Sequence, residues 1–276
     1  MLVGDLVTPG VITDTVAAVS PDVLIHCAGM VNVDACEQDP ALAYACNTDI
    51  TRRLAHAVGP RCLVVYITTD GIFKGDRPFA IEEQLPCPRT VYGRSKLHGE
   101  WEVELATRNH LIVRTNFYGW SSGRKQTAAE WLYHALAAGQ SITLFDDFFF
   151  SPIYVVDFVE RLALLIESEH RGIFHLCGKD RVSKGQFGAL MAEAANLSLK
   201  NVRSGSIDDA HLVAPRPKDM SLSGERFRRI TGVDAPGCLA GLLRFVADRG
   251  RSLGARFDGG QDHRHRETGV LKVGGE

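Results

Sequence analysis

Residues 66–96, "YITTDGIFKGDRPFAIEEQLPCPRTVYGRSK", decide the fold class that this sequence predicts. The segment begins as a β-branched strand, continues through a polar, proline-containing loop and ends in "YGRSK" (92–96). In a parallel α/β sheet the carboxyl ends of the strands form the ligand-binding edge, and Thr69 and Asp70 occupy such an end. The segment therefore predicts a functional site at the end of a buried strand.

Strands and helices alternate on both sides of this segment. Residues 20–29 predict a buried strand and a turn, and residues 39–59 predict a helix capped by Asp39. Residues 92–107 predict another helix, with Glu100, Glu102 and Glu104 facing water. The alternation is typical of a Rossmann-like, doubly wound parallel α/β sheet. Further strands are predicted at 61–70, 110–119, 141–145 and 172–178, and further helices at 125–138, 155–168, 182–196, 221–231 and 236–249.

Two domains and a tail follow from this order. We expect a partial nucleotide-binding domain at 1–118 and 141–177, and a small α/β substrate domain at 119–140 and 178–249. Residues 250–276 are rich in Gly, Arg and His, which predicts a disordered tail. The run "DHRHRE" (262–267) holds two histidines, but a solvated charge cluster is its more ordinary interpretation, so no metal site is predicted.

Composition and charge argue against several classes of protein. A content of 45% hydrophobic and 23% charged residues is ordinary for a globular protein, and the net charge of −2 gives no indication of a nucleic-acid partner. No apolar run reaches the ~18 residues of a membrane helix, and we expect no secretory signal. The seven cysteines are odd in number and include no C-x-x-C spacing, which predicts reduced, buried thiols in a cytoplasmic protein.

The spacing of Tyr92 and Lys96 predicts a proton-transfer site, because positions i and i+4 share one face of a helix. A tyrosine hydroxyl titrates at a pKa of about 10, and a nearby ammonium lowers that pKa by stabilising the phenolate. Tyr92 could then protonate a carbonyl oxygen that Thr69 holds. The Y-x-x-x-K spacing is common by chance, so an exposed helix pair is the alternative; the strand that ends at Thr69 favours a site.

Seven stretches extend the pattern along the chain. They are "PDVLIHCAGMVNVDACEQDPALAYACNT" (21–48), "ITTDGIFKG" (67–75), "VYGRSKLHGE" (91–100), "VRTNFYG" (113–119), "FSPIYVVDFV" (150–159), "GIFHLCG" (172–178) and "PRPKDMSL" (215–222). Together they resemble an extended short-chain dehydrogenase/reductase, and more narrowly the dTDP-4-dehydrorhamnose reductase family, over roughly residues 4–248. The resemblance implies NAD(P)H-dependent reduction of the 4-keto group of a nucleotide-linked deoxysugar, in dTDP-rhamnose or related sugar biosynthesis.

The resemblance also implies catalytic and substrate-binding residues. Thr69 matches the catalytic Ser/Thr, Tyr92 the proton donor and Lys96 its partner. Arg216 matches a basic segment near the sugar nucleotide, whose diphosphate suits a guanidinium fork, although a plain surface arginine is an equally open interpretation. The implied substrate-binding residues are Thr69, Asp70, Asn116 and Arg216.

The implied cofactor is NADP or NAD. Asp5 and Leu6 match a pair that brackets the adenine, and residues 27–29 match a turn that lies along the cofactor. Asn47 matches a residue on the cofactor side, with a purely structural helix residue as the alternative. The implied cofactor-binding residues are Asp5, Leu6, Cys27, Ala28, Gly29, Asn47, Thr68, Tyr92 and Lys96.

The sequence departs from the family pattern in three places. Gly71 stands where an aromatic residue is usual, and Phe150 stands where a small residue is usual; both changes bear on the sugar pocket. The family's first two strands and its glycine-rich pyrophosphate turn have no counterpart before Asp5. We therefore expect a fragment or a mis-assigned start, with a genuine short form as the alternative. In that short form a strand near Val3 could pair with residues 23–26, and NAD(P)H binding would be weak or lost.

A second interpretation is a non-catalytic binding or regulatory protein of the same fold, as in the β subunit of methionine adenosyltransferase, or an inactive fragment. The Thr-Asp and Tyr-Lys pairs favour descent from an active enzyme. Expected partners are a nucleotide sugar and a second copy in a homodimer, with no nucleic acid and no membrane. The sequence leaves open the sugar, the choice between NAD and NADP, and the oligomeric state.

Overall fold

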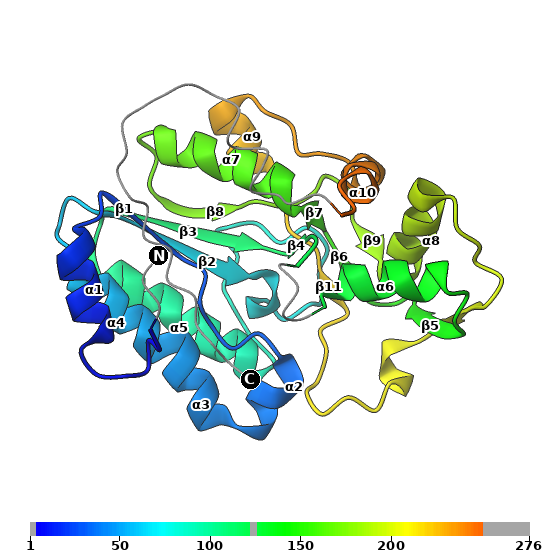
Figure 1. The fold of residues 1–276 in the computed structure, drawn as a ribbon, viewed down its shortest axis with the longest axis horizontal. Helices are drawn as coiled ribbons and strands as arrows, with labels where there is room; N and C mark the ends of the chain where they lie inside the picture. Colours follow the sequence, from blue (N-terminus) through cyan, green and yellow to red (C-terminus); the bar gives the residue numbers. More distant parts are fainter. Residues whose placement is uncertain (1–3, 122–125, 251–276) are drawn as a thin grey trace.

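A parallel four-stranded sheet in the order β1-β2-β3-β8 lies at the centre of the computed structural model, which describes residues 4–121 and 126–250 (Figure 1). This α/β architecture confirms the predicted fold class. The strands are β1 (Val23–His26), β2 (Leu63–Thr69), β3 (His110–Thr115) and β8 (Gly172–His175).

The strands of the sheet differ in burial. All residues of β2 are buried, as expected for a strand covered on both faces. In β1, however, Val23 is 38% and Ile25 48% exposed, so the prediction of a buried strand is wrong for this element. The reason is its position: in the described residues β1 pairs with β2 alone and forms an edge of the sheet. The strand predicted near Val3 lies outside the described residues.

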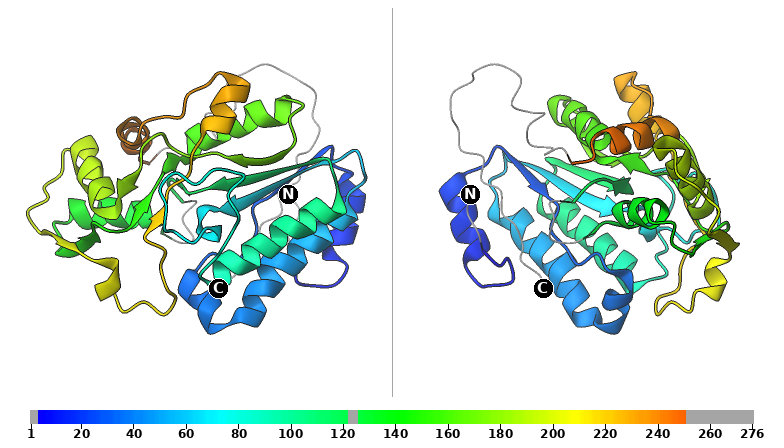
Figure 2. Two further views of the ribbon diagram at one scale, coloured as in Figure 1. Left: turned by 180° about the vertical axis from the view of Figure 1, so that it is seen from behind. Right: turned by 45° about the vertical axis from the view of Figure 1, so that its right-hand side comes forward.

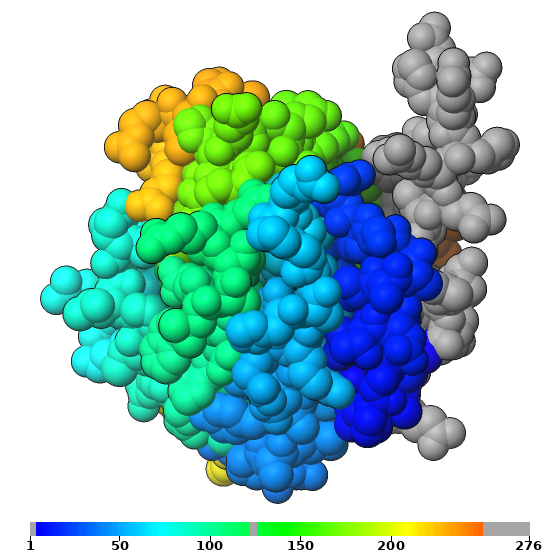
Figure 3. Space-filling view, turned by 90° about the vertical axis from the view of Figure 1, so that its left-hand side faces the viewer, coloured from blue at the N-terminus to red at the C-terminus, as the bar shows by residue number. Residues whose placement is uncertain are grey.

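Helices cover both faces of the sheet, as in a doubly wound fold (Figures 1 and 2). On one face α5 (Val91–Ala106) packs beside α4 (Ile50–Ala57), and α1 (Val11–Val19) lies next to α4 (Figure 3). On the other face α7 (Val155–Glu167) and α9 (Glu225–Thr231) supply Phe158 and Phe227 to the core.

The expectation that all three glutamates of α5 face water is wrong for one of them. Glu100 does not face water: it is 1% exposed, and its carboxylate lies 2.7 Å from the guanidinium of Arg114 in β3. Glu102 is half-buried and Glu104 is exposed. The helical pattern could not reveal the buried ion pair, because the partner comes from a distant strand.

The helix predicted over 39–59 is three consecutive segments: α3 (Pro40–Tyr44), a π-helical turn (Ala45–Asp49) and α4. Asp39 caps α3 as predicted, by accepting a hydrogen bond from the Leu42 amide. A further helix, α2 (Val33–Gln38), precedes them. The π-helical turn is wider than an α-helical one, and it presents Asn47 to α5.

A second lobe lies beside the carboxyl edge of the sheet (Figure 1). Helices α6 (Ala128–Ala137), α8 (Lys184–Ala195) and α10 (Cys238–Ala247) share its apolar core. Ser183 caps α8 as predicted, in a capping box with Gln186. The short strand pairs are β5 (Ile142–Phe145) with β10 (Val202–Gly205), β6 (Phe149–Phe150) with β9 (Val182–Ser183) and β11 (Asp219–Met220), and β4 (Phe117–Tyr118) with β7 (Ile153–Tyr154).

Two segments pack differently from the expected domain assignment. Strand β5, expected with the nucleotide-binding domain, pairs with β10 and contributes to the core of the second lobe. Helix α9, expected with the substrate domain, packs against β8. The division into two domains stays a prediction. Apart from Gly250, the predicted tail lies outside the described residues.

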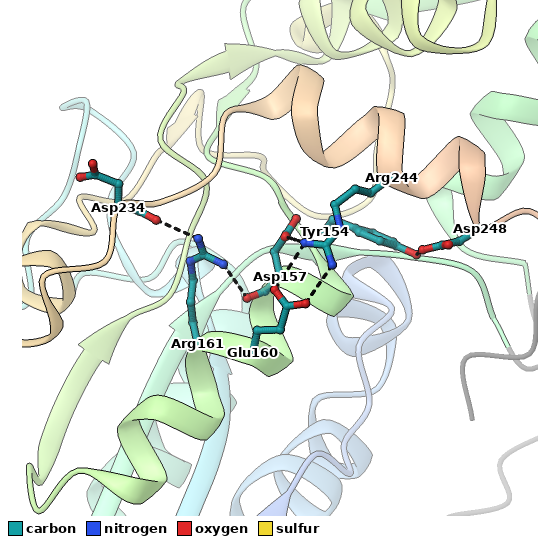
Figure 4. A network of polar contacts seen from close by, with 7 residues as sticks. All are labelled: Tyr154, Asp157, Glu160, Arg161, Asp234, Arg244 and Asp248. Carbon is teal, nitrogen blue, oxygen red and sulfur yellow. Dashed lines mark hydrogen bonds and ion pairs between the residues drawn. The ribbon is translucent and has the colours of Figure 1, made fainter. Parts of the chain in front are cut away.

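Charged side chains attach α10 to α7 (Figure 4). Arg244 of α10 pairs with Asp157 and Glu160 of α7, and the Tyr154 hydroxyl donates a hydrogen bond to Asp248 (2.9 Å). None of these side chains lines the cavity described below. The contacts therefore hold the two lobes together at a distance from the site.

The cysteines are free thiols, and Cys27 and Cys87 are exposed rather than buried as expected. None of the helices in the part of the chain that the structure describes combines the length and apolar character needed to cross a membrane. That part also holds no group of three His, Cys, Asp or Glu side chains suited to a metal ion. The run at 262–267 lies outside it.

Candidate active site

A cavity of about 400 Å³ opens at the carboxyl ends of β1, β2 and β3. Phe148, Arg216 and Met220 of the second lobe form its opposite wall. Most of the predicted site residues line it, although they come from distant parts of the chain. They are Cys27, Ala28, Gly29, Thr68, Thr69, Asp70, Tyr92, Lys96, Asn116 and Arg216.

The ends of β2 and β3 meet in one hydrogen-bonded group. The Thr69 hydroxyl donates to Asp70 Oδ1 (3.1 Å) and accepts from the Gly71 amide (3.1 Å). Asn116 donates from Nδ2 to Asp70 Oδ2 (2.6 Å). Asp70 is 3% exposed, and this burial raises the pKa of its carboxyl to about 6, while the bonds from Asn116 and Thr69 oppose the shift.

Tyr92 lies at the start of α5, close to Thr69. Thr90 caps the helix by accepting from the Gly93 amide, and the absence of a side chain at Gly93 allows close approach: a Cβ there would lie 2.4 Å from the Gly71 carbonyl oxygen. Burial raises the pKa of the Tyr92 hydroxyl to about 12, and hydrogen bonding with Thr69 opposes the shift. The expectation of a lowered pKa is therefore wrong for this cavity, because burial outweighs any effect of Lys96.

Lys96 lies one turn further along α5 and lines the same cavity, as the i, i+4 spacing predicts. Its ammonium donates to the Ile67 carbonyl (2.9 Å) and lies 4.1 Å above the centre of the Tyr66 ring. Burial lowers the pKa of Lys96 to about 8, and the charge of Glu100 opposes the shift. The other ammonium hydrogens have no carboxylate partner among the described residues, so they can serve a ligand.

Asn47 holds the cofactor-side turn but does not line the cavity. It is 0% exposed; its Oδ1 accepts from the Met30 amide (2.8 Å), and its Nδ2 donates to the Met30 carbonyl (3.0 Å) and to Ser95 Oγ (2.9 Å). A Cβ at Gly29 would lie 2.6 Å from Asn47 Oδ1, so glycine is needed there. Asn47 therefore reaches this cavity only through the turn at 27–29, and its expected place on the cofactor side stays a prediction.

Asp5 and Leu6 also lie away from the cavity. Asp5 is exposed and accepts from the Val7 amide (3.0 Å). Leu6 is 3% exposed and packs with Ile12 and Ile50. Their expected position beside an adenine stays a prediction.

Arg216 reaches the cavity with its guanidinium already paired. Its Nη2 donates to Asp34 Oδ2 (2.9 Å), and the Ala214 amide donates to Asp34 Oδ1 (2.9 Å). Asp34 belongs to α2, so this carboxylate connects a second-lobe loop to the first lobe. The sequence carries no signal that would identify Asp34, since its partners lie far away along the chain.

Gly71 and Phe150, the two residues that differ from the family pattern at single positions, lie differently with respect to the cavity. A Cβ at Gly71 would lie 3.4 Å from Thr69 Oγ1 and 4.0 Å from Tyr92 Cε1, which are ordinary contacts. Glycine therefore leaves open space beside both side chains. Phe150, in contrast, is 3% exposed and does not line the cavity, so this change does not act on the cavity directly.

The nicotinamide-ribose end of an NAD(P) cofactor fits the chemistry of one wall. The Lys96 ammonium and the Tyr92 hydroxyl are donors suited to ribose hydroxyls, and the turn at 27–29 adds backbone groups to the same cavity. Among the described residues, Gly29 and Gly71 are the glycines at this cavity, and neither lies in a glycine-rich turn. No residue is therefore assigned to the pyrophosphate.

The fold and this cavity define an α/β protein with a Thr-Tyr-Lys group at the carboxyl edge of a parallel sheet. The protein family described as RmlD substrate binding domain matches residues 3–249, and the chain belongs to this family.

Individual relatives confirm the resemblance to dTDP-4-dehydrorhamnose reductases. One from Mycobacterium tuberculosis (strain H37Rv) is 33% identical over 218 residues, which cover 75% of this chain and 70% of the relative. The crystal structure of another, from Bacillus anthracis in complex with NADP, is 28% identical with a TM-score of 0.83 and covers 88% of this chain and 86% of that one. Methionine adenosyltransferase 2 subunit beta from Xenopus tropicalis is also similar, at 27% identity over 83% of this chain and 72% of the relative.

Proposed function

We propose that this protein is an oxidoreductase that reduces the 4-keto group of a nucleotide-linked deoxysugar with NADPH or NADH, as in dTDP-rhamnose biosynthesis. The observation that carries the proposal is that Thr69, Tyr92 and Lys96 line one cavity. The relatives named dTDP-4-dehydrorhamnose reductase support the choice of reaction.

Tyr92 is the proposed proton donor to the sugar oxygen. Its raised pKa keeps the hydroxyl protonated at neutral pH, so the proton is available when charge develops on that oxygen. The Lys96 ammonium stabilises the phenolate that remains, and Thr69 positions the Tyr92 hydroxyl. A bound nicotinamide cofactor supplies the hydride.

The proposed substrate side combines groups from both lobes. Arg216 offers a guanidinium to the diphosphate, in exchange for Asp34. Asp70 and Asn116 line the same cavity, and the absence of a side chain at Gly71 leaves room for the sugar ring beside Thr69 and Tyr92. We assign Lys96, Tyr92, Thr68 and the turn at 27–29 to the cofactor side; preference between NAD and NADP stays open.

Three further expectations belong to this proposal. We expect the reaction in the cytoplasm and a homodimer in solution, and we expect the short-chain dehydrogenase/reductase type of chemistry. The similarity to methionine adenosyltransferase 2 subunit beta supports a second candidate, a binding or regulatory role without turnover. The same cavity would then hold a nucleotide without reducing a sugar.

The test of the proposal is an assay with dTDP-4-dehydrorhamnose as substrate. The oxidation of NADPH or NADH is monitored by the absorbance of the reduced cofactor. Tyr92→Phe should reduce kcat by about 100-fold or more, because it removes the proton donor, and should leave binding of the sugar nucleotide nearly unchanged. Tyr44→Phe is a matched control on α3, since Tyr44 does not line the cavity.

Near-normal turnover of Tyr92→Phe would show that the assigned role is wrong. Binding of the nucleotide sugar by the native chain without any cofactor oxidation would favour the regulatory candidate instead.

A further inference from the structure

The second-lobe wall of the cavity carries two apolar side chains that the proposed function leaves without a role. Phe148 and Met220 line the cavity, and both are half-buried. They belong to the small sheet β11-β6-β9, in which Phe150 of β6 pairs with Met220 of β11 and Phe148 comes just before β6. Because side chains two apart in extended chain point to the same side, Phe148, Phe150 and Met220 share one face of this sheet.

Contacts inside the second lobe hold Phe148 in this wall. Its carbonyl accepts a hydrogen bond from the Lys184 amide (3.0 Å), and the next amide, of Phe149, donates to the Lys218 carbonyl (2.8 Å). The Lys184 ammonium lies 5.3 Å from the centre of the Phe148 ring and 3.3 Å from that of Phe150, a distance range in which a cation attracts an aromatic face. The position of the Phe148 ring is therefore set by its own lobe.

The segment that contains β11 crosses the carboxyl edge of the central sheet. Before β11, Arg216 donates to Asp34, in the helix that follows β1. After β11, the Leu222 carbonyl accepts from the thiol of Cys177, which follows β8 (3.3 Å). Since β1 and β8 are the two outer strands of this sheet, Met220, which lies between these contacts, is opposite the ends of β2 and β3. The apolar wall therefore faces the strand ends that carry the proposed catalytic group.

The chemistry of a sugar ring matches two such different walls. A pyranose ring carries its oxygens at the edge and C–H groups on its faces. The edge with the reacting oxygen has to meet Thr69 and Tyr92, and Asp70 and Asn116 add polar groups to the same wall. Hydride reaches a carbonyl carbon through one face of the ring, which leaves the other face for the protein. Aromatic side chains are well suited to cover a face of C–H groups.

We propose that Phe148 is a sugar-binding residue: with Met220 beside it, its ring covers one face of the sugar of the substrate. This inference deepens the proposed function and rests on it for the position of the sugar. Gly71 leaves the opposite wall without a side chain, so the ring of Phe148 is the aromatic surface offered there from across the cavity. A deoxysugar suits this wall, because an additional hydroxyl on the covered face would give up water against carbon.

Isothermal titration calorimetry with dTDP and with dTDP-rhamnose tests the contact without turnover. In Phe148→Ala, dTDP-rhamnose should bind about 10-fold more weakly, which corresponds to roughly 50 Å² of apolar surface no longer covered. Binding of dTDP should stay nearly unchanged, since dTDP has no sugar at that position. Phe148→Tyr keeps the ring and should bind both ligands like the native chain. The matched control is Phe149→Ala, because the Phe149 ring lies 3.6 Å from the Arg181 guanidinium and does not line the cavity.

A second variant covers the case in which Phe148→Ala does not fold. Phe148→Leu keeps an apolar side chain but loses the flat ring, so it should lose part of the preference for dTDP-rhamnose over dTDP. An equal weakening of both ligands would place the ring against the nucleotide and overturn the proposal. A preference for dTDP-rhamnose that is unchanged in these variants, or a native chain that binds both ligands equally, would overturn it as well.

The catalytic consequence has its own readout. A contact to the face of the ring is made before and during the reaction, so Phe148→Ala should raise KM for dTDP-4-dehydrorhamnose and leave kcat nearly unchanged. A fall in kcat at constant KM would contradict the binding role. If the native chain prefers dTDP-rhamnose to dTDP but oxidises no cofactor, the proposed reaction fails, and the calorimetry still decides whether Phe148 binds the sugar.

Discussion

Each lobe has one lysine beside the cavity, and the two lysines are held in different ways: Lys96 is buried and lines the cavity, whereas Lys184 is half-buried and lies over Phe148, which lines it. Lys96 donates to the Ile67 carbonyl inside its own lobe and is supported below by the buried pair of Glu100 and Arg114. The Lys184 ammonium lies 3.3 Å from the centre of the Phe150 ring in its own lobe.

The same difference separates the other residues of the two walls. On the first-lobe side, the buried Asn47 holds the turn at 27–29 through the half-buried Met30 backbone and is itself bonded to the buried Ser95. On the second-lobe side, Arg216 is half-buried and paired with Asp34 across the interface. The first-lobe side is therefore preorganised, which catalytic groups require. On the second-lobe side, Arg216 can exchange Asp34 for a ligand anion when a ligand binds.

The largest expected effect tests the rigidity of the first wall. Arg114→Leu leaves the Glu100 carboxylate buried without its partner, so the free energy of unfolding should fall by about 3–5 kcal/mol, measured by urea denaturation. The double variant Glu100→Leu/Arg114→Leu should recover much of this loss. Lys218→Met removes exposed second-lobe ion pairs with Asp147 and Asp208 and should change stability little. Equal losses for Arg114→Leu and Lys218→Met would contradict the comparison.

The next effect tests the exchangeable wall. Arg216→Ala should weaken binding of dTDP by about 1.5–3 kcal/mol, the range for a hydrogen bond to a charged group, as measured by isothermal titration calorimetry. Asp34→Asn keeps an oxygen for the Ala214 amide but removes the charge that competes for Arg216, so dTDP should bind at least as tightly as to the native chain. An unchanged dissociation constant in Arg216→Ala would exclude Arg216 from the site.

The smallest effect concerns pH and His26, a buried histidine at the end of β1 in the first lobe. His26 bonds to Thr51 (2.9 Å), and burial together with the charge of Lys96 lowers the pKa of its imidazole to about 3. Its contribution to stability is therefore complete above pH 6.5 and is lost as the pH falls toward 3, because the unfolded chain binds the proton first. When the pH falls from about 7.5 to 5.5, the free energy of unfolding of the native chain should decrease by about 1 kcal/mol more than that of His26→Gln. His170→Gln, at an exposed site, is the control, and equal losses in His26→Gln and in the native chain would show that His26 is not buried neutral.

Sequence alone determined the fold class and the first-lobe half of the candidate site. Thr69 was found because it ends an apolar strand, and Tyr92 and Lys96 because a fixed spacing along a helix puts two side chains on one face. These are local rules, which hold wherever the strand and the helix form. The same rules identified the Asp39 and Ser183 caps, whose partners lie three residues away.

Only the tertiary structure decided which distant side chains complete the site. Glu100 follows the pattern of a surface glutamate, yet it is buried because Arg114 arrives from β3. Asn47 acts through Met30, Arg216 is held by Asp34, and Lys184 lies over the Phe150 ring. The energies of these contacts depend on burial and on distances between segments far apart in the chain, and neither quantity is encoded in local spacing.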